Sequence, residues 1–500
     1  MALSLLMSVA GLMAKERLTV LYVGGSPQFS TYGEFTKEQL KKSAEERTAD
    51  FAKFLRQRFT KVNVVSARDY KPEMSAAADV TVFDAIPPYT RKAERVMGAD
   101  GKVKSVIPPA CLPDDFSCAA LCIADASNRV GRSLGTKNDW YCLCLRNYAY
   151  NSDLSHAVFQ GPWKVTPTME NREVPFEARD YGAVTGGTVP ERIDMWKVYD
   201  PKKMEGLSTR FGLICRPEGY LDSPDTEVIS SGESGKSFES VAIARHGNFF
   251  HWGFCGAPSE MTPSGRDLFA NSIVYTSKFK GHPVIARKYE EAIVTRDFLP
   301  LIKYSNSKEA WRYQAKADLD FYNETVEKLK ELKARVAAGE ELPEEAMRYA
   351  SAPLPEKPAE TTYADYLMMR EPQLFKVFGD DEEEYMRYYD RNRPYFRAGD
   401  MIYNLVVDKE ARSLGIPNND VRILDKAISL LEEGGEKSKI GDTILKRYTL
   451  CRFQTPKEWR EWYDKNHDKL FFTESGGWLW LLNTDNPNDP TNDYSVLSRE

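Results

Sequence analysis

An unbroken apolar run that ends in two glycines constrains the fold of this chain more than any other feature. The run covers residues 18–23 and is followed by the segment GGSP. Apolar runs of this length without alternation are typical of strands that are buried on both faces, as in parallel sheets. A helical pattern over residues 36–59 follows, with apolar side chains at helical spacing. Strand, glycine turn and long helix predict a doubly wound α/β domain with a mostly parallel sheet.

Four further apolar runs continue this pattern and predict the second to fifth strands. They cover residues 61–67, 79–85, 117–124 and 140–145. From residue 183 to 254 the runs become short and are separated by Gly, Pro, Asp and Ser, which indicates an antiparallel β extension that ends in a hairpin. Thr262 and Pro263 then predict a helix with Thr as its cap and Pro at its first position.

The length of 500 residues predicts more than one domain. Composition shifts and proline clusters divide the chain into a signal peptide, the α/β domain, a long bracing helix with its linker, a helical domain with a degenerate repeat, and a tail. The predicted bounds of these parts are, in that order, 1–14, 15–285, 286–350, 351–485 and 486–500.

The first fourteen residues resemble the core and cleavage region of a signal peptide. Residues 3–14 are rich in Leu, Met and Ala, with small residues near the end, although a positively charged start is missing. This segment predicts an exported, periplasmic or secreted protein. After it, no apolar stretch is long enough to span a membrane.

Charge and cysteine placement exclude several classes of protein. A net charge of −6 with no basic block gives no support for a nucleic-acid partner. The eight cysteines show no zinc-ligand spacing, so no metal site is predicted. No cofactor is predicted either. Cys118, Cys122, Cys142 and Cys144 lie in apolar runs and are predicted to be buried free thiols.

A degenerate repeat lies in the C-terminal part. Ten residues from Glu384, EYMRYYDRNR, resemble ten residues from Glu458, EWREWYDKNH, at a constant offset of 74 positions. Each copy runs into an apolar stretch. Two helical hairpins that stack on each other would explain this pattern, and they would offer a surface for a protein partner.

The candidate ligand site lies where the predicted parallel strands end. Parallel sheets leave a crevice at their carboxyl edge where the strand order reverses, and glycine lets backbone N–H groups approach a ligand closely. The candidate residues follow the first, fourth and fifth strands: Gly24, Gly25, Ser26, Asp125, Ser127, Arg129 and His156. The catalytic candidates among them are His156, Asp125 and Ser127. The alternatives remain open, because the glycines could form only a tight turn and the polar residues could only cap and pair locally.

These features together resemble the ThuA-like, or trehalose-utilisation, family, which has a flavodoxin-like fold of the class I glutamine amidotransferase type. The carrying segments are LYVGGSP, AEERTADFAKFL, WYCLCL leading to SHAVFQGP, and ARHGNFFHWGF with its following helix; they span residues 18–280. The resemblance implies a link to carbohydrate utilisation, with a sugar or oxidised sugar as the small-molecule ligand. The chain departs from the family pattern at His156, which is followed by Ala157 in place of proline.

The amidotransferase fold implies a nucleophile elbow, G-x-C-x-G, after the fourth strand. This chain has Ala124, Asp125, Ala126 and Ser127 there, so glutaminase activity is not expected. Three functions therefore compete: an enzyme of carbohydrate utilisation, a binding module that kept the fold and lost the chemistry, and an interaction scaffold that uses the helical repeat. A dense polar cluster at the strand ends would favour the first, and a filled apolar cleft would favour the other two.

Overall fold

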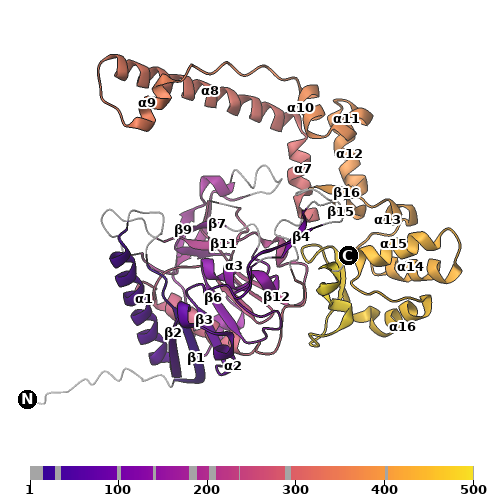
Figure 1. Ribbon diagram of the computed structural model, residues 1–500, viewed down its shortest axis with the longest axis horizontal. Helices are drawn as coiled ribbons and strands as arrows, with labels where there is room; N and C mark the ends of the chain where they lie inside the picture. The colour runs from indigo at the N-terminus through magenta and orange to yellow at the C-terminus, as the bar shows by residue number, and fades with distance from the viewer. Residues whose placement is uncertain are drawn as a thin grey trace, which may run out of the picture. The chain divides into compact units, whose positions relative to one another are not determined.

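The computed structural model describes most of the chain: residues 15–28, 35–97, 103–107, 109–138, 142–179, 189–201, 210–235, 237–287, 294–399 and 404–498 (Figure 1). The signal-peptide segment 1–14 and two positions of the predicted fifth strand, 140 and 141, lie outside these residues. The chain forms two compact units. Arg296–Pro394 belongs to one unit, whereas Tyr395–Glu500 joins the N-terminal part in the other.

A ten-stranded mixed sheet forms the centre of the larger unit, with the order β2-β1-β3-β6-β14-β13-β12-β8-β10-β9. The first five strands in this order are parallel to one another. Their bounds are β1 Glu16–Gly24, β2 Phe59–Ser66, β3 Val80–Phe83, β6 Ala120–Ile123 and β14 Phe249–Trp252. The N-terminal part is therefore an α/β structure with a parallel half-sheet, as the sequence predicts.

Helices cover both faces of the parallel strands. On one face lie α1 (Lys37–Arg58), α4 (Ala157–Gln160) and α6 (Pro263–Ser277), which pack on Val20, Tyr22 and Leu121. On the other face, α3 (Asp125–Gly131) and the short α2 (Pro72–Ala76) region lie over the strands. Thr36 and Thr262 cap α1 and α6, and Pro263 is the first residue of α6, as predicted.

The other half of the sheet is antiparallel. It contains β13 (Val241–His246), β12 (Thr226–Gly232), β8 (Tyr148–Tyr150), β10 (Arg192–Lys197) and β9 (Met169–Glu173). The strand predicted at 140–145 forms in its described residues, but its expected place in the mostly parallel sheet is wrong. Within the described residues, Cys142–Leu145 forms β7, which pairs with β11 (Gly212–Ile214) in a separate two-stranded sheet. The next strand, β8, enters the main sheet in the opposite direction because it pairs antiparallel with β12.

Two further features of this part differ from expectation. A hairpin of β4 (Glu94–Met97) and β5 (Val103–Ile107) has no counterpart in the prediction. All eight cysteines are free thiols, but only Cys122 of the four singled out is fully buried. Cys142 and Cys144 are half-buried, because β7 belongs to a small sheet at the border of the core. Cys118 is also half-buried, because it lies two residues before the start of β6.

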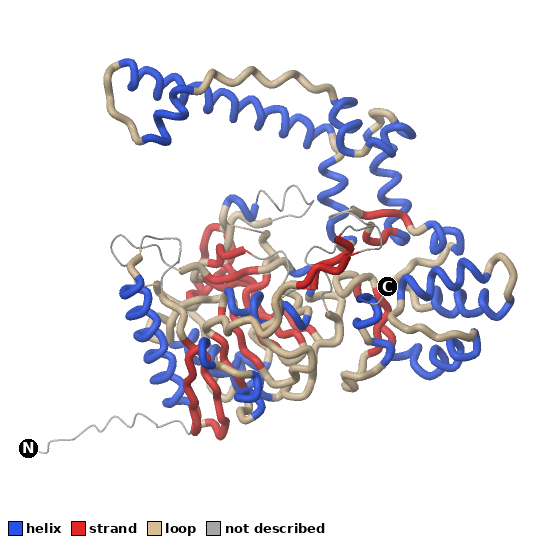
Figure 2. The backbone as a smooth tube through the Cα atoms, viewed as in Figure 1, coloured by secondary structure: helices blue, strands red, loops and turns tan. Residues whose placement is uncertain are grey.

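The C-terminal part of the larger unit is mainly helical. It contains α13 (Lys409–Leu414), α14 (Arg422–Glu433), α15 (Ser438–Tyr448) and α16 (Pro456–Asn466), with the hairpins β15 (Phe396–Ala398) and β16 (Leu405–Val407), and β17 (Leu470–Thr473) and β18 (Leu479–Leu482). The helices share a core with Trp459, Trp462 and Trp480. Helices predominate in the second half of the chain (Figure 2).

The repeat is a helix followed by a short 3-10 turn and a β-hairpin, rather than the expected helical hairpin. The first copy contains α12 (Glu382–Asn392), and the second contains α16. Each element of the second copy begins 74 residues after its counterpart: 382 and 456, 393 and 467, 396 and 470, 405 and 479. Asn392 and Asn466 each donate a side-chain hydrogen bond to the carbonyl four residues earlier.

The smaller unit consists of helices. Its bounds are α7 Leu299–Ser305, α8 Lys308–Ala337, α9 Glu344–Ser351, α10 Tyr363–Arg370, α11 Pro372–Phe378 and α12. The predicted long helix is α8, which begins at the Ser307 cap and runs unbroken for 30 residues, or about 45 Å. Helix α9 folds back onto it, burying Val326 and Leu329. The segment between α9 and α10 contains Pro353, Pro355 and Pro358 and has no regular structure.

Candidate functional site

The carboxyl ends of β1, β3, β6 and β14 form one edge of the sheet. The strand order reverses between β1 and β3, since β2 and β3 lie on opposite sides of β1. A crevice at such a reversal is the usual ligand position in open α/β sheets. Gly24, Asp84 and Asp125 stand at or just after these strand ends.

The turn from β6 into α3 has the geometry of a nucleophile elbow. Ala124 has φ 49° and ψ −125°, a conformation that L residues rarely adopt. Its N–H donates to Trp252 O at 2.8 Å, so the residue is held between β6 and the end of β14. In hydrolases this sharp, strained turn presents a nucleophilic side chain. Here the position is occupied by a methyl group, which cannot attack a substrate.

A buried ion pair lies beside the elbow. Arg47 of α1 donates from Nε to Asp84 Oδ2 at 2.8 Å and from NH2 to Oδ1 at 2.7 Å, and both side chains are inaccessible to solvent. Tyr22 donates its hydroxyl to Asp84 Oδ2 at 2.8 Å. Burial raises the pKa of Tyr22 well above its usual value, and Asp84 raises it further. Arg47 stays charged, because Asp84 offsets the effect of burial and raises the pKa of the guanidinium.

The same guanidinium holds the chain that follows β1. Arg47 NH1 donates to Gln28 Oε1 and to Cys255 O, the latter at 2.9 Å. Gln28 in turn donates from Nε2 to Glu260 Oε2 at 2.5 Å, and its backbone N–H donates to Ser43 Oγ at 2.8 Å. The segment from Gly25 to Gln28 is therefore held at the carboxyl edge of the sheet by α1 and by the loop that follows β14.

A second arginine bridges the ends of β1 and β6. Arg210 NH2 donates to Asp125 Oδ1 at 2.5 Å, and NH1 approaches Pro27 O at 3.5 Å. The Asp125 side chain is 39% exposed and that of Arg210 only 11%, so the carboxylate end of this pair faces solvent. Cys255 donates its thiol to Arg210 O at 2.9 Å. Burial raises the pKa of Cys255, so the thiol is protonated near neutral pH and is not an activated nucleophile.

The structure brings together four of the seven residues that the sequence singles out. Gly24 ends β1, Gly25 is exposed with φ +121°, Ser26 is half-buried, and Asp125 joins this segment through Arg210. Ser127 lies apart, because its hydroxyl donates to Cys122 O at 2.8 Å inside the core. Arg129 is exposed on α3, and no hydrogen bond or ion pair links it to another described residue.

His156 does not join this group, and the expectation that it would is not met. It follows β8, which runs opposite to the parallel strands, so its loop lies at the edge where those strands begin. There it caps α4 by accepting from Val158 N, and its Nε2 lies 3.7 Å from Glu227 Oε2. The pKa of Glu227 is lowered to about 2, because hydrogen bonds from His156, Arg245 and Tyr275 outweigh the opposing effect of burial.

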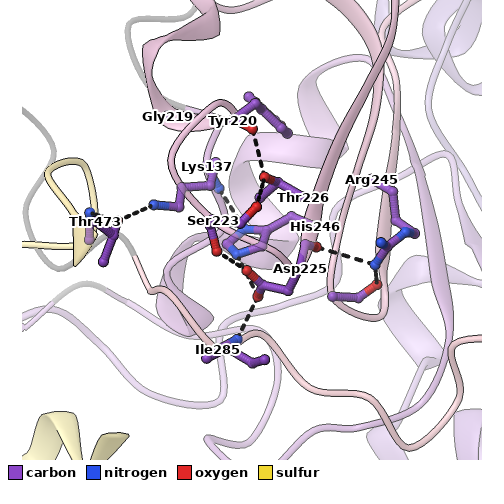
Figure 3. Close-up of polar contacts among 12 residues, drawn as sticks. Lys137, Gly219, Tyr220, Ser223, Asp225, Thr226, Arg245, His246, Ile285 and Thr473 are labelled. Carbon is purple, nitrogen blue, oxygen red and sulfur yellow. Dashed lines mark hydrogen bonds and ion pairs between the residues drawn. The ribbon is translucent and has the colours of Figure 1, made fainter. Parts of the chain in front are cut away.

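A second buried polar cluster lies at the edge where the parallel strands begin, beside the C-terminal hairpin (Figure 3). His246 accepts a hydrogen bond at Nδ1 from Lys137 N at 3.1 Å, so its proton resides on Nε2, 3.2 Å from Asp225 Oδ2. Lys137 is fully buried, and its Nζ contacts Ser475 Oγ, Thr473 Oγ1 at 3.3 Å and Asp222 Oδ1 at 3.5 Å. This cluster joins the α/β part to the loop between β17 and β18.

Sequence reasoning overlooked most of the polar network at the carboxyl edge. The buried position of Arg47 could have been predicted, because this residue lies at helical spacing between Ala44 and Phe51 on the apolar face of α1. A charged residue in that position must either be exposed or find a partner. Arg210, Gln28 and Glu260 carried no signal, since loops far apart in the sequence bring them to the edge.

Neither a metal site among the described residues nor a match to a family model or a curated protein is found. Among the residues that the structure describes, no group of three or more His, Cys, Asp or Glu side chains could hold a metal ion. Within the same residues, no helix combines the length and apolar character needed to cross a membrane. No model of a known protein family matches the sequence, and a search of curated proteins finds no similar protein.

Proposed function

We propose that this chain is a ThuA-like ligand-binding protein linked to carbohydrate utilisation, which binds a small hydroxylated molecule at the carboxyl edge of its parallel strands without covalent catalysis. The observation that carries the proposal is Ala124, which has the backbone of a nucleophile elbow and no nucleophile. The fold assignment in this proposal is flavodoxin-like. The parallel strands, numbered among themselves, have the order 2-1-3-4-5 that is typical of that fold.

The groups at the edge suit hydroxyl-bearing ligands. Asp125 uses one carboxylate oxygen for Arg210 and has a second for a ligand hydroxyl, while the exposed Gly25 leaves its backbone accessible. Ser26 adds a hydroxyl that is both donor and acceptor. A sugar presents neighbouring hydroxyls that can donate to the Asp125 carboxylate and accept from the Arg210 guanidinium.

Thermal-shift measurements test this proposal. The full chain is screened against a panel of sugars, oxidised sugars and divalent metals, because a ligand that binds only the folded state stabilises it by about 2.7 kcal/mol at a concentration of 100 times Kd. Asp125→Ala is expected to abolish the shift. His156→Ala is the control, since this residue lies at the other edge of the sheet. Loss of the shift in both variants, or in neither, would contradict the proposed site.

An enzyme of carbohydrate utilisation is the second candidate. The dense polar network of Arg47, Asp84, Gln28 and Glu260 favours it, because such a network was the feature expected of a catalytic edge. NMR spectra of the bound sugars over time separate the two functions. A binding module leaves them unchanged, whereas an enzyme converts one of them and loses turnover in Asp125→Asn.

Export is part of the proposal. Residues 1–14 are expected to direct a reporter enzyme such as alkaline phosphatase to the periplasm when fused in front of it. A fusion that stays in the cytoplasm would contradict export without affecting the proposed ligand site.

A further inference from the structure

The smaller unit contains a groove between the junction of α7 and α8 and the outer side of α12. Its volume is about 520 Å³, and its lining residues are Lys303, Tyr304, Ser307, Glu309, Glu382, Glu383, Met386, Arg387 and Asp390. Tyr304 and Met386 are half-buried and form the apolar floor. This volume is large enough for a long side chain of another protein and its neighbours.

The groove is built by fixed contacts. Glu382 Oε1 accepts a hydrogen bond from Lys308 N at 2.9 Å, which ties the start of α12 to the start of α8. Lys303 Nζ lies 2.7 Å from Asp390 Oδ1 at the other end. Between them, Asn306 is buried and donates to the Tyr389 hydroxyl at 3.0 Å. The walls are therefore held in place before any partner arrives, which lowers the entropic cost of binding.

The rim of the groove carries an excess of negative charge. Four carboxylates face two cations, and each cation already has an acidic partner. Lys303 pairs with Asp390, and Arg387 donates to Glu383 at 3.0 Å and to Glu384 at 2.9 Å. Glu309 is exposed in the first turn of α8, and no ion pair connects it to another described residue. Glu382 also has no cationic partner among the described residues, but its Oε1 already accepts from Lys308 N, so Glu309 is the rim carboxylate that remains available to a partner.

Floor and rim together match one kind of side chain. A lysine or arginine has an aliphatic stem that packs on apolar surface and a charged head that stays at the solvent border. A tyrosine ring and a methionine thioether are favourable floors for such a stem, and carboxylates are the natural partners of the head. An acidic or purely apolar segment would leave the rim carboxylates without a cationic partner.

We propose that this groove docks a lysine- or arginine-bearing segment of a partner protein, with the stem on Tyr304 and Met386 and the cationic head at Glu309. This interaction surface is independent of the ligand site in the larger unit. It gives the smaller unit a role in recruitment, and it does not depend on the proposed sugar ligand.

Two labelled peptides test the proposal with the full-length protein: GGKGGKGG and the same sequence with norleucine in place of each lysine. The two peptides share their stems and differ in charge. Fluorescence anisotropy is expected to show that the lysine peptide binds at least tenfold more tightly at 50 mM salt. Its affinity is expected to fall severalfold at 300 mM salt. Equal binding of both peptides, or binding of neither, would overturn the proposal.

Variants locate the binding. Glu309→Lys is expected to weaken binding of the lysine peptide at least tenfold. Glu345→Lys is the matched control, because Glu345 is also an exposed acid in the first turn of a helix, α9, and the net charge changes equally. Met386→Ala is expected to reduce the affinity severalfold through loss of the floor. Equal losses in Glu309→Lys and Glu345→Lys would show attraction by overall charge and overturn the docking site, with circular dichroism confirming that each variant is folded.

Discussion

Arg47 and Asp84 form a bidentate ion pair at the carboxyl edge of the sheet, and neither side chain is accessible to solvent. The pair joins α1 to the end of β3 at the position where the strand order reverses. Asp84 also accepts from Tyr22, and Arg47 also reaches Gln28 and Cys255 O. One buried guanidinium therefore organises the loops around the candidate ligand site.

Removal of one partner from this ion pair is expected to destabilise the folded protein strongly. Asp84→Asn leaves the Arg47 charge buried without its counterion, and the free energy of unfolding is expected to fall by about 3–5 kcal/mol in urea titrations. Glu45→Gln is the control on the same helix, because Glu45 and Lys41 form an exposed pair of the kind that contributes little. A loss below about 1 kcal/mol in Asp84→Asn would show that the pair is not what holds the edge together.

Replacement of Ala124 by glycine is expected to stabilise the folded protein. Its φ of 49° is unfavourable for any residue with a Cβ, so Ala124→Gly should raise the free energy of unfolding by about 1 kcal/mol after the loss of the buried methyl. Ala126→Gly, two residues later inside α3, is expected to lower it by a similar amount. Destabilisation by both substitutions would argue against a strained elbow.

The same position predicts that glutamine is not hydrolysed. The chain should release no ammonia from glutamine, because the elbow lacks a thiol and burial raises the pKa of the neighbouring Cys122. Ammonia release that disappears in Cys122→Ala would contradict this prediction.

Lys137 is expected to anchor the C-terminal hairpin. Lys137→Met removes the ammonium that contacts Thr473, Ser475 and Asp222, and the free energy of unfolding is expected to fall by about 1–3 kcal/mol. Hydrogen exchange in the loop between β17 and β18 should rise at the same time. Lys439→Met, at an exposed helical position, should leave both quantities unchanged. Unaltered exchange in Lys137→Met would show that other contacts hold the hairpin.

Stability is expected to decrease between pH 7 and pH 5. Burial lowers the pKa of His251 to about 4 and also lowers that of His246, although Asp225 opposes the second shift. Below the unfolded value near 6.5, the unfolded chain therefore binds protons that the folded chain does not, and each histidine contributes up to about 1.4 kcal/mol of lost stability per pH unit. Urea titrations at pH 7, 6 and 5 measure this slope, and a flat profile would contradict it.

The C-terminal repeat shows how far sequence periodicity can be trusted. The constant offset of 74 positions was visible in the aromatic pattern, and every element of the two copies keeps it. The pattern did not reveal that each copy ends in a β-hairpin. Stretches such as LVV and LWLL are too short for periodicity to distinguish a strand from a helix, and pairing with β15 and β17 decides between them.

The sequence by itself determined the local elements. Four predicted elements formed, because each depends on residues within one or two turns of the chain. They are the strand at 18–23, the apolar face of the helix that begins at Lys37, the Thr262-Pro263 start of α6 and the hairpin that ends the 183–254 segment. Backbone preference, capping and side-chain periodicity act over that range.

The tertiary structure alone decided which polar residues meet. Asp125 was placed correctly because it follows a parallel strand, whereas His156 was not, because the direction of β8 depends on its pairing with β12, eighty residues away in the chain. Arg210 reaches Asp125 for the same reason, from a loop that precedes β11. Strand direction and loop convergence are set by the burial of whole faces and by hydrogen bonds between distant segments. Neither can be inferred from a single segment of the sequence.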